Sequence, residues 1–181
     1  MRRLFTVDEL HRMGRSGVLG ADERLELIEG EILETDAGGC AHAARVRRLN
    51  RLLVSRFGER AIVQVGEPLV LGPRSELRPD LTLLKPRDDF YAARHPRPRD
   101  VLAVVEVAGA TVEDEREAKL PLYARAAIPE VWLVDLADEV VHVFRRPLRA
   151  HYGQGVRYGR GKRIVVKSLA GPTFRVNEIL G

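Results

Sequence analysis

The run VLAVVEV at residues 101–107 decides the fold, because a single acid interrupts an otherwise apolar segment. β-Branched residues without polar alternation predict a central strand that is buried on both faces of a sheet. Glu106 is the exception in this strand, and an ionised carboxylate there is costly unless it is paired or binds a metal. The run therefore predicts a covered sheet and, at Glu106, a buried polar site.

Segments on either side of this run alternate between helical and strand-like patterns. Three stretches have the apolar spacing of helices: residues 7 to about 14–17, 41–57 and 112–126. Five others have the short apolar runs typical of strands: 62–65, 69–71, 81–84, 131–135 and 140–144. Residues 24–35 alternate about Glu29-Gly30 as a β-hairpin does, and residues 150–181 predict two short strands and a terminal turn. These elements predict an α/β fold in which helices flank a mixed β-sheet.

The chain has 181 residues and is 45% hydrophobic, which predicts a single folded domain. We expect a helix-and-hairpin extension over residues 1–36, a core over 41–145 and C-terminal strands over 146–181. Cys40 is the only cysteine, which excludes an internal disulfide and a cysteine-based zinc cage and suits a reducing compartment. No segment approaches the ~18 apolar residues of a membrane span, so a soluble cytoplasmic protein is the expectation.

Arginine dominates the basic residues, since 26 of the 30 are arginine and four are lysine. Genome composition is the ordinary reason for such a skew. In an arginine-rich chain, however, a lysine can mark a position that needs a compact ammonium group. The net charge of +4 is compatible with an anionic partner but does not identify one.

Asp80 stands at the start of one predicted strand and Glu106 inside another. Two neighbouring carboxylates repel each other unless a cation lies between them. Mg²⁺, with Mn²⁺ as a substitute, is the natural cation, because it binds one or two carboxylates together with water and phosphate. Lys119, at the border of the buried face of the next helix, can orient water or stabilise a pentacovalent phosphate. These three residues form the set expected for phosphodiester hydrolysis.

Each of these residues also has a structural interpretation. Asp80 follows Pro79, where an aspartate commonly caps a turn. Lys119 lies four residues after Glu115, which is the favourable order for a surface ion pair on a helix. Glu106 is the hardest of the three to explain without a partner, because acids inside apolar strands are rare.

Six fragments, in the same order and spacing, make the chain similar to a known family. They are RLELIEGEI at residues 24–32, His42, Arg78-Pro79-Asp80, VVEV at 104–107, Lys119 with Tyr123, and IPEVWLVD at 128–135. On these motifs the chain resembles the Uma-type restriction-endonuclease-like proteins, a bacterial group within the PD-(D/E)xK nuclease superfamily. The similarity extends over nearly the whole chain.

The resemblance implies a restriction endonuclease-like core in which Asp80 and Glu106 bind Mg²⁺. It also implies that the catalytic lysine has moved from two residues after the glutamate to the following helix, here Lys119. The implied activity is DNA cleavage, with a homodimer supplying two active sites for a duplex. The chain departs from the family pattern twice, with AGAT at residues 108–111 in place of Leu-Ser-Pro-Ser-Thr, and with Glu115 in place of an aspartate.

Weaker candidates complete the predicted site. His42, near a helix start, is a candidate second base or phosphate contact, although a histidine there is often a polar cap. Glu31 is a candidate for a further acid of the site, and Glu26 and Glu29 of the same hairpin are alternatives to it. All three glutamates can also be explained as solvent-exposed residues at the edge of the hairpin. Three arginines share one side of the helix at 41–57: Arg45, Arg48 and Arg51. They are candidates for contacts with DNA phosphates, and a solvated basic face is the alternative interpretation.

The leading hypothesis is a Mg²⁺-dependent endonuclease that hydrolyses phosphodiester bonds in DNA. The altered turn at 108–111 and the glutamate at 115 favour an alternative, a nuclease-like module that binds nucleic acid but no longer cuts it. A small interaction protein without nucleic-acid function is the third hypothesis that the sequence leaves open.

Overall fold

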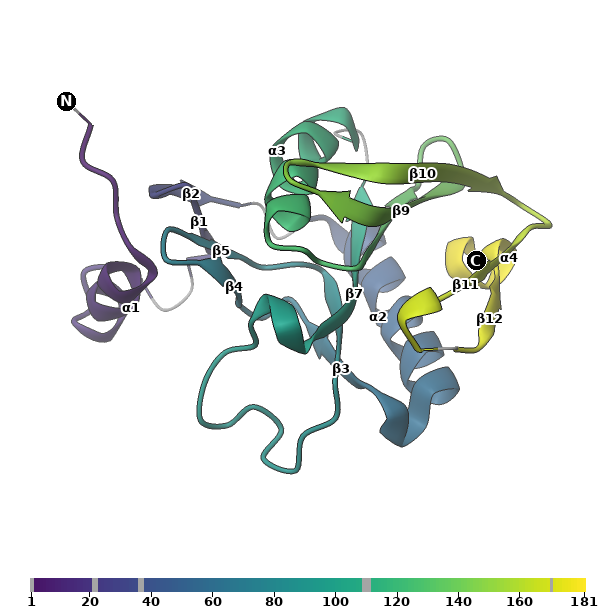
Figure 1. Ribbon diagram of the computed structural model, residues 1–181, viewed down its shortest axis with the longest axis horizontal. Helices are drawn as coiled ribbons and strands as arrows, with labels where there is room; N and C mark the ends of the chain where they lie inside the picture. The colour runs from purple at the N-terminus through teal and green to yellow at the C-terminus, as the bar shows by residue number, and fades with distance from the viewer. Residues whose placement is uncertain (1, 21–22, 36–37, 109–111, 170) are drawn as a thin grey trace.

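The computed structural model describes residues 2–20, 23–35, 38–108, 112–169 and 171–181, without the side chains of 112–115. Within these ranges the α-helices are α1 (Val7–Arg15), α2 (Cys40–Phe57), α3 (Val112–Arg125) and α4 (Val176–Leu180). The strands are β1 (Leu25–Ile28), β2 (Glu31–Glu34), β3 (Ile62–Val65), β4 (Leu69–Gly72), β5 (Ser75–Leu77), β6 (Leu81–Leu84), β7 (Val101–Ala108), β8 (Glu130–Asp135), β9 (Val140–Leu148), β10 (His151–Gly159), β11 (Arg163–Val165) and β12 (Thr173–Arg175). Figure 1 shows the N-terminal elements at one end of the molecule and the C-terminal elements at the other.

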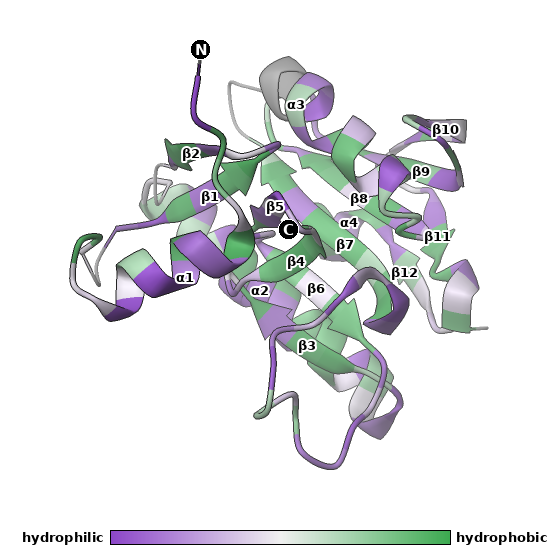
Figure 2. Cartoon of the chain, turned by 60° about the vertical axis from the view of Figure 1, so that its left-hand side comes forward, coloured by the Kyte–Doolittle hydropathy of each residue, from purple (hydrophilic) through white to green (hydrophobic). Residues whose placement is uncertain are grey.

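The main sheet has six strands in the order β10-β9-β8-β7-β6-β3. β7 and β8 run parallel, whereas the other neighbours pair antiparallel, so the predicted mixed sheet is confirmed. All eight residues of β7 are buried, as the apolar run predicted. Figure 2 shows the hydrophobic colouring of this central strand and of β6 beside it.

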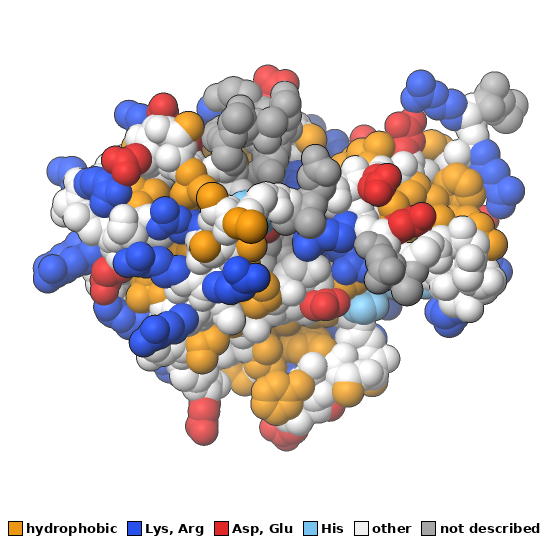
Figure 3. All heavy atoms as spheres, turned by 180° about the vertical axis from the view of Figure 1, so that it is seen from behind, with side chains coloured by type: hydrophobic (Ala, Val, Ile, Leu, Met, Phe, Trp, Pro, Cys, Tyr) orange, Lys and Arg blue, Asp and Glu red, His pale blue; other side chains and the backbone are white. Residues whose placement is uncertain are grey.

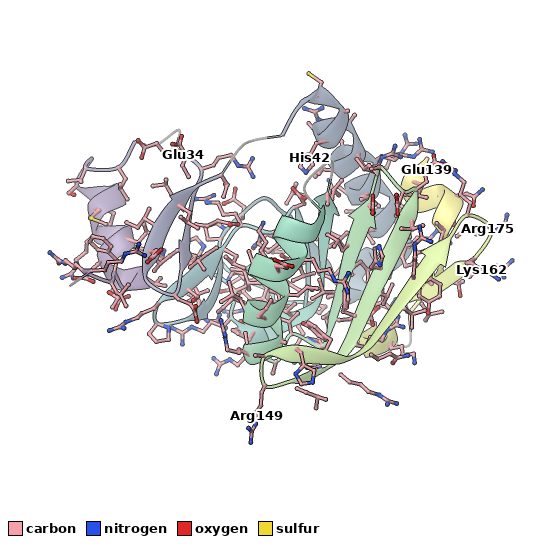
Figure 4. The ribbon with its side chains drawn as sticks, turned by 90° about the horizontal axis from the view of Figure 1, so that it is seen from above. Glu34, His42, Glu139, Arg149, Lys162 and Arg175 are labelled. Atoms are coloured by element: carbon pink, nitrogen blue, oxygen red, sulfur yellow. The ribbon has the colours of Figure 1, made fainter. Side chains whose placement is uncertain are left out.

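Helices cover the main sheet on both faces, as the predicted α/β fold requires. α2 buries one stripe against the first face, and the C-terminal elements β12 and α4 extend the same cluster with Phe174 and Ile179. α3 covers the second face with Leu122 and Tyr123. Figure 4 shows α2 and α3 on opposite sides of the sheet. The predicted helix at 41–57 is confirmed as α2, whose apolar stripe is buried: Val46, Leu49, Leu53 and Phe57.

The N-terminal elements form a second sheet, of order β2-β1-β5-β4. The hairpin of β1 and β2 turns at Glu29 and Gly30, whose φ angles of 50° and 94° are those of a type I′ turn. α1 begins with a capping box between Thr6 and Glu9 and packs against the hairpin. The predicted helix and hairpin are therefore confirmed.

The C-terminal segment differs from the prediction. Where two short strands and a terminal turn were expected, β10 is a nine-residue strand that pairs along β9, and α4 closes the chain. β11 and β12 are the two short strands. The main sheet therefore continues past residue 145, and β5 is a further strand that the sequence did not predict. Of the helices described, none is long and apolar enough to cross a membrane.

Candidate active site

Asp80 and Glu106 lie side by side on neighbouring strands. Asp80 directly precedes β6, which pairs antiparallel with β7 through Leu81 and Val105. The Asp80 N–H donates a hydrogen bond to Glu106 Oε2 at 3.1 Å, and the Val107 N–H donates one to Asp80 Oδ2 at 2.8 Å. Each carboxylate therefore accepts a hydrogen bond from a backbone N–H of the neighbouring segment. These two bonds fix both carboxylates where β6 begins beside the last residues of β7.

Glu106 is buried, with 3% of its surface exposed, on the face of the sheet that α3 covers. The Tyr123 hydroxyl donates to Glu106 Oε1 at 2.5 Å, and Lys119 Nζ lies 3.5 Å from the same oxygen. Burial raises the pKa of the Glu106 carboxyl; the Lys119 ammonium opposes this shift and the Asp80 carboxylate adds to it. The donors around Glu106 therefore offset only part of the cost of its charge.

Lys119 projects from α3 into the acidic cluster. Its Nζ is 3.5 Å from Glu106 Oε1 and 3.5 Å from Glu26 Oε1, and its side chain is mostly buried. Tyr123 follows one helical turn later, so that the same face of α3 presents both groups to Glu106. The side chain of Glu115, the alternative partner on the helix, and residues 109–111 of the altered turn lie outside the described residues.

Glu26, and not Glu31, is the third carboxylate of the cluster. Glu26 is buried, accepts the Arg78 N–H at 2.8 Å and lies beside Lys119. Glu31 is exposed and pairs with Arg2 at 2.8 Å, so the expectation that it joins the site is wrong. The reason is its place along the hairpin. Glu31 pairs with Ile28 at the tip, whereas Glu26 lies two residues further from the tip along β1, on the side of the cluster.

His42 joins the site from the first turn of α2. Its Nε2 lies 3.1 Å from Asp80 Oδ2, the oxygen that also accepts the Val107 N–H. The helix is capped by Gly39 without a side-chain hydrogen bond, so His42 is not a polar cap. Gly38 has a φ of 68°, and a methyl group added there would lie 2.6 Å from His42 Nδ1. Figure 4 shows His42 near one end of α3.

Among the described residues, none of the three predicted arginines pairs with a carboxylate of the cluster, and Arg45 lies with Arg48 near Gly181 at the C-terminus. Arg48 and Arg51 line a hollow on the outer side of α2, together with Ser55. Arg51 is nine residues after His42, about two and a half helical turns, and therefore lies on the opposite side of the helix. Figure 3 shows Lys and Arg side chains gathered on this side of the molecule. A DNA contact through these arginines stays a prediction, separate from the acidic cluster.

Glu26 and Tyr123 belong to the cluster, but the sequence predicted no role for either of them. Glu26 was only a competitor of Glu31, because three glutamates of one hairpin cannot be separated without the register of the sheets. Tyr123 belonged to a family motif without a function. Its spacing of four residues from Lys119 was the available signal, since residues four apart share a helix face.

The carboxylate oxygens of this cluster are suitable ligands for a hard divalent cation that keeps most of its water molecules. No residue of the described chain bonds Asp80 Oδ1, and Glu106 offers a second carboxylate beside it. No three His, Cys, Asp or Glu side chains of the described ranges converge as metal ligands. A closed zinc-type cage is therefore not formed here, whereas one or two carboxylates with water is the usual way in which proteins bind Mg²⁺.

A mixed sheet covered on both faces, with this acidic cluster on its central strands, defines the chain as a restriction endonuclease-like α/β protein. The model of the Uma2 family, described as "Putative restriction endonuclease", matches residues 7–177, and the chain belongs to this family. A crystal structure of "a putative nuclease belonging to DUF820" from Anabaena variabilis ATCC 29413 has a similar fold. Its TM-score is 0.77 at 15% sequence identity, over 97% of each chain. No curated protein matches the chain. The family description supports nuclease activity in general terms.

Proposed function

We propose that this protein is a Mg²⁺-dependent endonuclease that hydrolyses phosphodiester bonds in DNA, with Mn²⁺ able to replace Mg²⁺. The charge of the site carries the proposal. Glu26, Asp80 and Glu106 supply three carboxylates against the single ammonium of Lys119. The Asp80 and Glu106 carboxylates are held side by side on neighbouring strands, and a divalent cation between them would remove their mutual repulsion.

The residues of the cluster have separate roles in this proposal. Asp80 and Glu106 hold the metal, which when bound lowers the pKa of a water and neutralises charge on the phosphate. Lys119 orients the attacking water or donates to a phosphate oxygen as negative charge develops. Tyr123 fixes the orientation of the Glu106 carboxylate through its hydrogen bond. His42 orients Asp80 through Oδ2 and leaves Oδ1 for a ligand.

A cleavage assay tests this function. The purified protein is incubated with supercoiled and linear DNA in Mg²⁺ or Mn²⁺, beside Asp80→Asn and Lys119→Met. Wild-type protein should cut the DNA, and each variant should lose at least about 100-fold in rate, which is typical when a group that stabilises the transition state is removed. Equal activity in all three proteins would show that the cleavage comes from elsewhere.

Matched surface variants control for the change of charge. Asp138→Asn removes an exposed carboxylate, and Lys162→Met removes an exposed ammonium. Figure 4 shows Lys162 at the C-terminal end of the molecule, away from His42. Both controls should cut DNA at the wild-type rate.

One observation favours a second candidate, a nuclease-like module that binds DNA without cutting it. The Lys119 ammonium bridges Glu26 and Glu106 and already neutralises part of the cluster. Calorimetric titration with Mn²⁺ separates the two candidates, because a cluster that takes no metal even with DNA present cannot support the hydrolysis. A homodimer that brings two sites to a duplex is proposed by analogy with the family, and sedimentation with DNA would detect it.

A further inference from the structure

Arg24 and Arg78 approach the acidic cluster from the second sheet. Arg24 comes directly before β1 and Arg78 directly after β5, and these strands pair antiparallel through Leu27 and Glu76. The Arg78 N–H donates to Glu26 Oε1 at 2.8 Å. Arg78 also begins the segment that leads through Pro79 to Asp80. Both arginines are therefore attached to the backbone that positions the carboxylates.

The two guanidinium groups converge on one turn, at Gly66. Arg78 Nη1 lies 3.4 Å from the carbonyl oxygen of Gly66, and a methyl group added at Gly66 would lie 3.5 Å from Arg24 Nη2. The Gly66 N–H donates to the carbonyl oxygens of Pro79 and Asp80 at 3.2 and 3.1 Å. Two positive groups therefore meet at a turn that is bonded to the candidate metal ligand.

Neither guanidinium group has a counter-ion in the described part of the chain. The Nε of each is cut off from water and has no hydrogen-bond partner, and no described carboxylate pairs with either side chain. Unpaired N–H groups are costly when buried, and neighbouring cations repel each other. Each side chain is only half-buried, so each is open to a ligand on one side. A phosphate group matches the planar donors of guanidinium groups and would offset both costs.

We propose that Arg24 and Arg78 together bind a backbone phosphate of the DNA, next to the phosphate that is cut. This inference rests on the proposed function and assigns a contact with the substrate beyond the phosphate that is cut. Three carboxylates repel a polyanion, and two guanidinium groups at the Gly66 turn, whose N–H is bonded to the Asp80 carbonyl oxygen, reduce that repulsion where the strand must enter. This contact lies at the Gly66 turn, whereas Arg48 and Arg51 lie on the outer side of α2.

Salt-dependent DNA binding tests the contact. The affinity for a labelled duplex of about 20 base pairs is measured by fluorescence anisotropy, in Ca²⁺ to slow cleavage, over a series of salt concentrations. The double variant Arg24→Gln/Arg78→Gln should lower the slope of log affinity against log salt by about 0.9, which is the loss of one phosphate contact. Arg149→Gln is the control, since Figure 4 shows Arg149 at the far end of the molecule from His42, and its slope should equal that of wild type.

Folding and metal binding of the double variant are measured in parallel. Its melting temperature should stay close to that of wild type, because neither guanidinium group pairs with a described carboxylate, and its Mn²⁺ affinity should be no lower, because two cations are removed. A wild-type slope in a well-folded double variant would overturn the arginine contact while leaving the nuclease intact. A reduced slope in a protein that never cuts DNA would support the contact and refute the nuclease. Absence of DNA binding by the wild-type protein would overturn both.

Discussion

Glu106 is the one acid in a strand whose other side chains are apolar. Its carboxylate accepts hydrogen bonds from the Tyr123 hydroxyl and the Asp80 N–H and lies near the Lys119 ammonium. These contacts do not cancel the cost of burial, because the pKa of Glu106 is still raised. The metal-free protein therefore gives up stability to keep a carboxylate where a cation can bind it.

Replacing Glu106 with glutamine should stabilise the metal-free protein at neutral pH. The raised pKa means that the folded state holds the Glu106 proton more tightly than the unfolded chain does. The contribution of this group to stability is therefore complete below the ordinary glutamate pKa and is lost as the pH rises through the raised pKa. The melting temperature of Glu106→Gln in EDTA, relative to wild type, should increase through this window and then level off.

Glu31→Gln is the control for that experiment, because Glu31 is an exposed glutamate outside the cluster. Its melting temperature should differ from that of wild type by a small and constant amount. A constant difference for Glu106→Gln over the same pH range would contradict a raised pKa at this carboxyl.

Replacing Tyr123 with phenylalanine should weaken metal binding while preserving the fold. The change keeps the buried ring and removes only the hydroxyl that donates to Glu106 Oε1. A hydrogen bond to a charged group contributes about 1.5–3 kcal/mol, so the affinity for Mn²⁺ at neutral pH should fall about ten-fold or more. The pH at which Mn²⁺ binding is half complete should move upward, as calorimetry across pH would measure.

Tyr152→Phe is the matched control, since the Tyr152 hydroxyl donates to the Ile128 carbonyl oxygen and touches no carboxylate of the cluster. Its Mn²⁺ affinity should equal that of wild type. If Tyr123→Phe behaves in the same way, Tyr123 has only a packing role.

At the scale of elements, the hairpin of β1 and β2 shows how register selects one acid from several. Glu26 enters the cluster, whereas Glu31 lies at the hairpin tip beside Arg2. Glu26→Gln should lower DNA cleavage at least about ten-fold, because Lys119 loses a carboxylate partner and its ammonium is held less firmly. Glu31→Gln should cut DNA at the wild-type rate. Equal rates in the two variants would exclude Glu26 from the chemistry.

Elements specified by local chemistry were predictable from the sequence. The capping box of α1, the Glu29-Gly30 turn and the left-handed Gly58 that ends α2 each depend on a few neighbouring residues. The apolar strand around Glu106 was predictable because it is buried on both faces. Asp80, Glu106 and Lys119 could be expected together from the family motifs, and the structure brings all three into contact.

Elements that depend on distant partners could not be predicted. β10 contains Gly153 and Gly155, which are poor strand residues, yet Gly155 pairs with Phe144 and leaves room for its ring. β5 is three residues long, and its buried Glu76 is paired with His11 from α1. In both cases the stabilising partner lies elsewhere in the fold, so the local pattern carries no signal.

In the whole molecule, the acidic cluster joins the two sheets. Glu26 comes from the second sheet, Asp80 and Glu106 from the main sheet, and Lys119 from the helix that covers it. The geometry of the cluster therefore depends on how the two sheets are held together. Arg78 contributes to this junction, because its N–H bonds the Glu26 carboxylate.

A buried ion pair fixes the C-terminal segment to the main sheet. Arg145 of β9 donates twice to the Glu130 carboxylate of β8, which also accepts the Trp132 indole N–H and the Lys167 N–H. Arg145→Met should lower the free energy of unfolding by about 3–5 kcal/mol, because a buried carboxylate loses its counter-ion. Urea denaturation measures this loss. The exposed Arg157→Met should change stability by less than about 0.5 kcal/mol, and a similarly small effect at Arg145 would contradict a stabilising role for the pair.

Anomalous diffraction from crystals soaked in Mn²⁺ tests whether Asp80 and Glu106 form one divalent-cation site with Lys119 beside it. Wild-type crystals should show a Mn²⁺ peak at about 2.0–2.2 Å from a carboxylate oxygen of Asp80 and one of Glu106, with the Lys119 ammonium nearby. The same soak of Asp80→Asn should show no peak. A wild-type crystal without Mn²⁺ at these carboxylates, or with Mn²⁺ bound only elsewhere, would show that the two acids do not form a metal site.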